Sequence, residues 1–178
     1  MRTIETGLEG LRIVELASHR DERGGFDRLW CRDEFAAADL AFRPIQSSLS
    51  TNLRAGTLRG MHWQEGAGAE TKLVRVVHGA IFDVAVDLRP GSPTRFRWYG
   101  LWLEVAVNRA LLIPPGFAHG FLSQADDSAV LYMMDAPHEP AAARGARWDD
   151  PRFAIDWPGA PVVISERDRT WPDFGEAR

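Results

Sequence analysis

From residue 45 to residue 134 the chain is a succession of short runs rich in Val, Ile, Leu, Phe and Trp, separated by Gly, Pro or Asn. The runs recur at a spacing of roughly 8–12 residues, which is typical of strands in an all-β sandwich or barrel. We therefore expect an all-β domain. The runs are IQSSLSTN (45–52), TLRGMHWQ (57–64), KLVRVVHGAIFDVAVDLR (72–89), FRWYGLWLEV (96–105), RALLIPPGFAHGFLS (109–123) and AVLYMM (129–134).

The flanking segments differ in character. Residues 11–16 (LRIVEL) alternate apolar and polar and predict an opening strand, and residues 19–27 (HRDERGGFD) predict a polar turn. Residues 32–40 predict the one convincing helix, with Asp33 as its cap. The proline-rich stretch 136–161 is expected to wrap the barrel as turns, with a short helix near 141–145. No boundary interrupts residues 1–178, so we expect a single domain.

Composition excludes several classes of partner. With 178 residues and 45% apolar content, the chain suits one globular domain. The net charge of −4 argues against nucleic acid as a partner, because no basic excess can neutralise phosphates. No apolar run approaches the ~20 residues that span a bilayer, and no leader is recognisable, so we expect a cytoplasmic protein without membrane contact. Cys31 is the sole cysteine, and an inert buried thiol is favoured over a nucleophile.

Polar side chains interrupt the apolar runs at a few positions. GTLRGMHWQ (56–64) places Arg59 and His62 in an otherwise apolar strand, and LIPPGFAHGF (112–121) leads through a rigid Pro-Pro turn and a permissive Gly to His119. Inward-facing positions of distant strands converge in a barrel. The residues that could meet in one pocket are Arg59, His62, Lys72, Asp83, His119 and Asp168.

Six motifs of this chain resemble, in order and with matching spacing, those of the dTDP-4-dehydrorhamnose 3,5-epimerases. They are DERGGF, GTLRGMHWQ, KLVRVVHGAIFDVAVDLR with GSPT, IPPGFAHGF, RWDDPRFAIDWP and ISERD, and they span about residues 11–174. The resemblance implies a cupin-type jelly-roll barrel and a homodimer that exchanges N-terminal strands. It also implies a nucleotide-linked 4-keto-6-deoxyhexose as substrate, epimerised at C3, C5 or both without a cofactor or metal.

The chemistry of that reaction suits the residue types. A C4 ketone acidifies the C3 and C5 hydrogens, so epimerisation needs a base, stabilisation of the enolate oxygen and an opposing acid. By resemblance His62 is the base, and Asp168 is the carboxylate that orients it, with Asp83 as a rival. Lys72 matches the cation near the enolate oxygen.

The resemblance also assigns residues to substrate binding. Arginine suits diphosphate through its fork of donors, and Arg59 matches such a contact. Arg23 matches another, which acts either within its own subunit or across the dimer. The full expected set is Arg23, Phe26, Arg28, Gln46, Ser47, Ser48, Arg59, His119 and Arg167.

Three positions depart from the family pattern. The tyrosine expected six residues after Tyr132, interpreted as the acid opposite the base, is His138. Ser48 replaces an Asn of the nucleoside-binding stretch, and Arg28 replaces a Glu. His138 is either a replacement acid or a loop histidine without a role.

Two other classes of function remain open. A metal-dependent cupin isomerase or oxygenase usually carries a second His two residues after the first, where this chain has Gln64. A non-catalytic sugar-nucleotide-binding barrel is the other alternative, made possible by His138.

Overall fold

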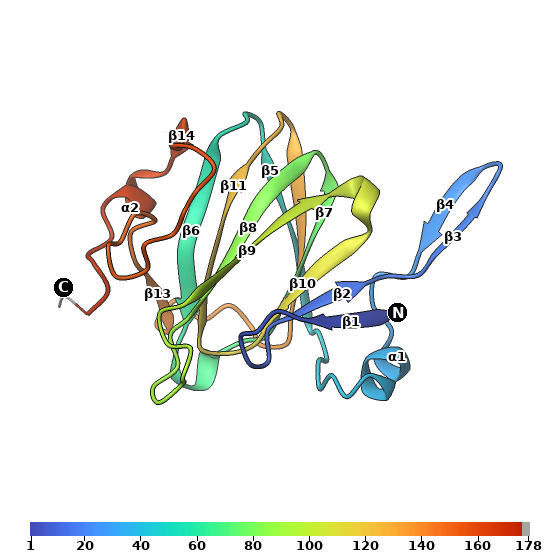
Figure 1. Cartoon of the computed structure of the whole chain (residues 1–178), viewed down its shortest axis with the longest axis horizontal. Helices are drawn as coiled ribbons and strands as arrows, with labels where there is room; N and C mark the ends of the chain where they lie inside the picture. Colours follow the sequence, from blue (N-terminus) through green and yellow to red (C-terminus); the bar gives the residue numbers. More distant parts are fainter. Residues whose placement is uncertain (176–178) are drawn as a thin grey trace.

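The computed structural model describes residues 1–175, and two sheets facing each other dominate it (Figure 1). The first sheet has the order β1-β2-β10-β7-β12-β5, and the second has the order β13-β6-β11-β8-β9, with β14 pairing parallel to β6. The all-β jelly-roll prediction is therefore confirmed.

Strand bounds in the first sheet are β1 Arg2–Glu5, β2 Arg12–Glu15, β5 Gln46–Asn52, β7 Lys72–His78, β10 Arg109–Ile113 and β12 Ser128–Met134. Those in the second are β6 Thr57–Gln64, β8 Ala80–Asp87, β9 Trp98–Glu104, β11 Phe117–Ser123, β13 Ala143–Gly145 and β14 Val163–Ile164. The helical elements are α1 Arg32–Ala37, α2 Glu166–Arg169 and the 3₁₀ turns η1 Gly66–Gly68 and η2 Val105–Val107.

Side-chain alternation explains how a strand serves both core and site. Val74 and Val76 of β7 belong to the buried cluster between the sheets, as does Val130 of β12. Because successive side chains point to opposite faces, Lys72 and Tyr132 share the inward face with these valines. The same periodicity that buries the core therefore also turns polar side chains into the barrel.

The outer faces of the two sheets are covered differently. Phe35 of α1 packs with Phe42 and Leu73 on the first sheet. Phe153 of the C-terminal segment packs with Met61 on the second. In Figure 1 the C-terminal segment with α2 lies on one side of the barrel, opposite the hairpin of β3 (Ser18–Asp21) and β4 (Gly24–Asp27). The predicted wrapping segment is thus present.

Two local predictions of secondary structure were wrong. Residues 19–27 form most of a hairpin, β3 Ser18–Asp21 with β4 Gly24–Asp27, and not merely a turn. The hairpin projects from the body in Figure 1, so neither face is buried and no apolar alternation marks it. Residues 141–145 contain strand β13 instead of a helix, because the edge of β6 supplies backbone partners that override the helical preference of alanine.

The helix at 32–40 is shorter than predicted and differently capped. It ends at Ala37, and its N-cap residue is Cys31, whose side chain makes no capping hydrogen bond. Asp33 lies in the first turn, where its charge complements the helix dipole. Cys31 is partly exposed and not buried as expected. Within the described residues, no helix is long and apolar enough to cross a membrane.

Candidate active site

Two histidines lie side by side on neighbouring strands of the second sheet. The antiparallel register of β6 and β11 sets His62 opposite His119. Each ring has its own carboxylate: Nε2 of His62 is 2.6 Å from Oδ1 of Asp168, and Nε2 of His119 is 2.6 Å from Oδ1 of Asp83. Asp83 therefore pairs with His119, and the carboxylate partner of His62 is Asp168.

The backbone around Asp168 fixes its carboxylate. Ser165 caps α2 by accepting a hydrogen bond from the Asp168 amide at 3.1 Å, and the Gly60 amide donates to Asp168 Oδ2 at 3.3 Å. Burial alone would raise the pKa of Asp168, but hydrogen bonds from His62, Gly60 and Trp171 outweigh it and hold the pKa below its usual range. An ionised Asp168 only accepts, so Nε2 of His62 carries a proton and Nδ1 is left as the basic nitrogen.

The second pair is more deeply enclosed. His119 and Asp83 are both buried, and the Tyr132 ring meets the His119 ring edge-on, with centroids 5.8 Å apart. Burial, reinforced by the negative charge of Asp83, raises the pKa of Tyr132 well above its usual range. The phenol therefore keeps its proton at neutral and moderately alkaline pH.

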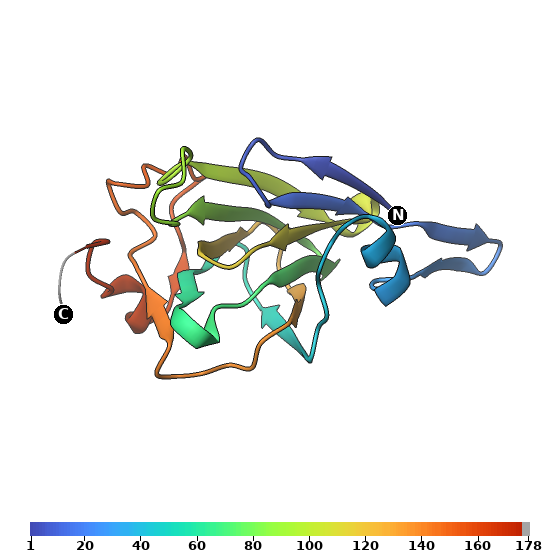
Figure 2. The ribbon, with the colours of Figure 1, turned by 90° about the horizontal axis from the view of Figure 1, so that it is seen from below.

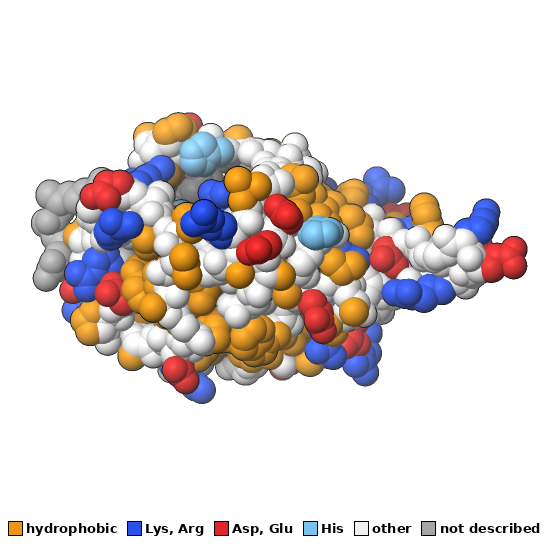
Figure 3. All heavy atoms as spheres, turned by 90° about the horizontal axis from the view of Figure 1, so that it is seen from above, with side chains coloured by type: hydrophobic (Ala, Val, Ile, Leu, Met, Phe, Trp, Pro, Cys, Tyr) orange, Lys and Arg blue, Asp and Glu red, His pale blue; other side chains and the backbone are white. Residues whose placement is uncertain are grey.

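These groups surround one cavity of about 520 Å³. Seven of the residues predicted from the sequence are among those that line it. On the face drawn in Figure 3 the surface is hollowed, and Lys or Arg and His side chains gather at the rim. The lining residues are Ser48, Leu49, Ser50, Arg59, His62, Lys72, His119, Tyr132, His138 and Asp168.

The cations of the cavity are held in different ways. Arg59 is exposed to the cavity and donates from Nε to Asn52 Oδ1 at 2.8 Å and from Nη2 to the Thr51 carbonyl at 3.2 Å. Both of these partners are neutral, so they position the guanidinium without cancelling its charge. Lys72 lies 3.1 Å from Glu70 and is largely buried. An anion entering the cavity thus meets the charge of Arg59 first.

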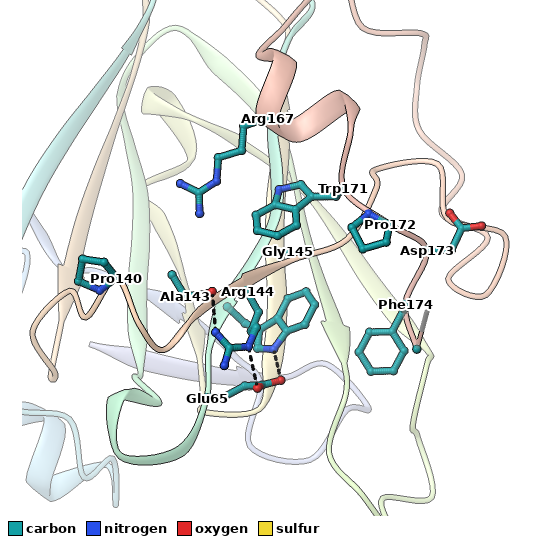
Figure 4. A pocket seen from close by; sticks show the side chains of 12 residues that line it. Glu65, Pro140, Ala143, Arg144, Gly145, Arg167, Trp171, Pro172, Asp173 and Phe174 are labelled. Atoms are coloured by element: carbon teal, nitrogen blue, oxygen red, sulfur yellow. Dashed lines mark hydrogen bonds and ion pairs between the residues drawn. The ribbon is translucent and has the colours of Figure 1, made fainter. Parts of the chain in front are cut away.

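A second hollow adjoins the cavity outside the barrel (Figure 4). A smaller pocket connects the two: it shares His62, Lys72 and His138 with the cavity and shares Arg144 and Arg167 with the outer hollow. The outer hollow measures about 770 Å³.

The walls of the outer hollow are aromatic and charged. The Arg167 guanidinium lies 5.1 Å from the Trp171 ring, and Arg144 pairs with Glu65 at 3.1 Å. A Cβ at Gly145 would lie 2.2 Å from the Trp171 ring, so only glycine admits the indole there. Arg167 therefore lies outside the main cavity, at the junction with this hollow.

Several predicted residues lie elsewhere in the single chain. Arg23 and Phe26 are on the projecting hairpin, where Arg23 pairs with Asp21 and Phe26 is 72% exposed. Arg28 pairs with Glu34 of α1 at 2.7 Å.

Only part of the stretch predicted to bind the nucleoside, Gln46 to Ser48, lines the cavity. Ser48 faces the cavity, and Ser47 is exposed and donates to the Tyr132 carbonyl at 3.2 Å. Gln46 accepts a hydrogen bond from the His138 amide at 3.2 Å.

Sequence reasoning missed Tyr132, Leu49 and Ser50 as cavity residues. For Tyr132 the signal was present in AVLYMM, since the position alternates with Val130 and therefore shares its inward face. Among residues 1–175, no group of three or more His, Cys, Asp or Glu is placed to hold a metal ion.

Comparison with known proteins agrees with this geometry. The sequence profile described as dTDP-4-dehydrorhamnose 3,5-epimerase matches residues 5–176. A protein of that name from Methanothermobacter thermautotrophicus is 42% identical over 178 residues, covering 98% of this chain and 95% of its own.

Solved structures show the same likeness. The Bacillus anthracis dTDP-4-dehydrorhamnose 3,5-epimerase, with TDP and PPi bound, superposes with a TM-score of 0.93 at 36% identity, covering 97% of this chain and 98% of its own. A double variant of ChmJ, a 3'-monoepimerase from Streptomyces bikiniensis in complex with dTDP, gives a TM-score of 0.87 at 30% identity, covering 94% and 84%. The chain belongs to the dTDP-4-dehydrorhamnose 3,5-epimerase family and is an isomerase of deoxysugar biosynthesis.

Proposed function

We propose that this enzyme epimerises a dTDP-linked 4-keto-6-deoxyhexose at C3, C5 or both, by proton transfer through an enolate. The observation that carries the proposal is the His62–Asp168 pair in a cavity that also holds Lys72 and Tyr132. The choice of dTDP follows the relatives, whose structures contain TDP or dTDP.

His62 is proposed as the base. Asp168 holds its Nε2 proton, so Nδ1 can accept a hydrogen from the sugar, and the ionised carboxylate stabilises the imidazolium that results. As the C–H bond breaks, negative charge moves to the C4 oxygen. Lys72 is the lining residue suited to stabilise that oxyanion, because it is a largely buried cation whose charge acts in a shielded site.

Tyr132 is proposed as the opposing acid in preference to His138. Its raised pKa keeps the phenol protonated, and it faces inward beside His119. The ChmJ variant carries a His-to-Asn and a Tyr-to-Phe substitution at positions 70 residues apart, the interval that also separates His62 from Tyr132. His138 is exposed at the mouth, where we expect it to contact the nucleotide instead.

The diphosphate is proposed to bind Arg59, with Arg167 next to the exit of the cavity. Arg23 and Phe26 are not among the residues that line this cavity, and their hairpin projects from the barrel (Figure 1), so they are proposed to serve the site of a partner in a homodimer. The cytoplasmic location and the lack of a cofactor stay predictions.

Deuterium wash-in tests the proposal. Purified enzyme is incubated with dTDP-4-keto-6-deoxyglucose in D₂O, and label at C3 and C5 is followed by NMR. Label at one or both carbons that is lost in His62→Asn supports the proposal and shows which carbon reacts. Binding of dTDP without any label would instead indicate the non-catalytic barrel, and label that disappears with a chelator would indicate the metal-dependent alternative.

A further inference from the structure

The connection between β12 and β13, residues 135–142, crosses from the first sheet to the second. We call it the strap; it is the orange segment along the lower edge of Figure 2. His138 sits in its middle and lines both the cavity and the connecting pocket. Pro137, His138 and Glu139 are all exposed, so packing alone does not fix this part of the strap.

A buried carboxamide fixes it instead. Gln64, at the end of β6, is 5% exposed, and the three hydrogen bonds of its side chain all go to backbone atoms. Its Oε1 accepts from the Glu139 amide at 2.6 Å, and its Nε2 donates to the carbonyls of Pro137 at 3.2 Å and Gly68 at 2.9 Å. The residues before and after His138 are thus both bonded to one rigid strand.

Two further contacts hold the same stretch from the other side. Gln46 of β5 accepts a hydrogen bond from the His138 amide at 3.2 Å. Asp135 Oδ1 accepts from the Thr71 amide at 2.7 Å, where the strap leaves β12. The backbone at 137–139 is therefore fixed by glutamines from both sheets, one on each side of the mouth.

Gly68 allows the strap to lie close. A Cβ at position 68 would be 2.8 Å from Cβ of Ala142 and 3.5 Å from Cβ of Glu139. A larger residue there would push the strap outward without touching any lining residue of the cavity.

We propose that Gln64 is a positioning residue, whose carboxamide holds the strap so that His138 faces the nucleotide part of the substrate. This inference rests on the proposed function, in which the sugar occupies the barrel and the nucleotide leaves through the mouth. Gln64 stands where a metal-dependent cupin carries its second His, but here both its Oε1 and its Nε2 are hydrogen-bonded to backbone atoms.

Gln64→Glu tests this with little change in shape. A carboxylate still accepts from the Glu139 amide but cannot donate to Pro137 or Gly68. We expect dTDP affinity, measured by calorimetry, to fall about fivefold or more and KM to rise in proportion, with kcat within about twofold of wild type. Gln124→Glu is the matched control, since the side chain of Gln124 donates to the Leu122 carbonyl, away from the strap; it should bind dTDP like wild type.

A double-mutant cycle separates positioning from general loss of stability. If Gln64 acts through His138, Gln64→Glu should weaken dTDP binding little further in a His138→Ala background. Additive losses, or unchanged affinity in Gln64→Glu, would overturn the inference. If Gln64→Glu does not fold, Gly68→Ala is used instead, because it displaces the strap and leaves Gln64 in place. We expect its dTDP affinity to fall as well, and a normal affinity would refute the proposal.

The wild-type enzyme distinguishes failure of this inference from failure of the proposed function. Wild type that neither binds dTDP nor labels the sugar contradicts the proposed function. Wild type that does both, beside a Gln64→Glu variant with unchanged KM, contradicts only the role of Gln64.

Discussion

Nε2 of His62 and Oδ1 of Asp168 are 2.6 Å apart although 106 residues separate them in the chain. The contact forms because α2, capped by Ser165, presents Asp168 to β6, where the Gly60 amide meets the second carboxylate oxygen. The carboxylate of Asp168 on α2 thus binds both the His62 ring and the backbone of β6. A base that must be re-formed in every turnover needs this kind of fixed partner.

His62→Asn should abolish exchange of substrate C–H with solvent deuterium while dTDP binding persists. Loss of a general base typically lowers rates ~10²–10⁴-fold. The measurement is NMR wash-in beside a thermal melt, with His78→Asn as control because His78 is exposed and its ring hydrogen-bonds the Asp127 carbonyl, away from the cavity. Near-normal exchange in His62→Asn would remove this residue from the mechanism.

Asp168→Asn should reduce exchange by a factor on the order of 10²–10⁴, because an amide can donate to Nε2 and force the wrong imidazole tautomer. The same variant should change acid stability. The folded pKa of Asp168 is lowered, so its contribution to the free energy of unfolding is complete above the ordinary carboxyl pKa and is lost as pH falls through the folded value.

Urea unfolding between pH 6 and about pH 3 checks this sign. We expect the stability of wild type to fall more steeply on acidification than that of Asp168→Asn. Parallel curves would show that the His62–Asp168 pair adds nothing to acid sensitivity.

Tyr132→Phe should slow inversion more than exchange, since it removes a proton donor and leaves the base. Because its pKa is raised, the phenol stays protonated as pH rises, so inversion should not decline through neutral pH. If His138 were the acid, inversion would depend on His138 and would survive in Tyr132→Phe. Comparing inversion in Tyr132→Phe, His138→Ala and His138→Tyr shows which residue is the acid. If inversion is lost only in His138→Ala, His138 is the acid and Tyr132 is not.

The sequence predicted the barrel because its signal is local. Apolar runs and turn residues specify strands wherever one face is buried, as for Val74 and Val76 of β7. The β3–β4 hairpin and β13 were missed for the same reason. Neither has a buried face of its own, and both form through backbone pairing that leaves no apolar pattern.

The site was predictable as a set of residues and, through the resemblance, as one pair, His62 with Asp168. Asp83 was left as a rival partner of His62, and its pairing with His119 instead depends on the register of β11 with β8 and β6. The register between two strands depends on residues far apart in the sequence, so the apolar–polar alternation within one strand does not predict it. Tyr132 was overlooked although its inward face follows from alternation with Val130.

Arg59→Ala should weaken dTDP binding by roughly 10–100-fold, the usual worth of a charged hydrogen bond, with a smaller effect on kcat. Asn52 and Thr51 orient its guanidinium without neutralising it. Calorimetry with dTDP is the measurement, and Arg54→Ala is the control because Arg54 is exposed and lines none of these cavities. Equal affinities in the two variants would contradict the diphosphate role of Arg59.

Arg23 lies on the β3–β4 hairpin, and side chains of the first sheet and of the loop before β10 hold the two ends of this hairpin. Arg75 of β7 pairs with Asp27 at 3.3 Å and with Asn108, and Asn108 donates to the Leu16 carbonyl at 2.9 Å. Both ends of the hairpin are thereby tied to the first sheet, and the hairpin projects away from the barrel (Figure 1). If it serves a partner's cavity, Arg23→Ala should impair the site of the other subunit.

Mixing two variants that are each impaired on their own tests this directly. A dimer of Arg23→Ala with His62→Asn would contain one complete site: the Arg23→Ala subunit keeps His62, and its partner supplies Arg23. Random re-association at equal amounts makes half of the dimers mixed, so about a quarter of wild-type activity should return at low substrate. If Arg23 instead acted within its own subunit, every mixed dimer would lack a complete site and no activity would return. Size-exclusion chromatography with light scattering must show a dimer for the test to apply, and a monomer there would itself refute the exchange of hairpins.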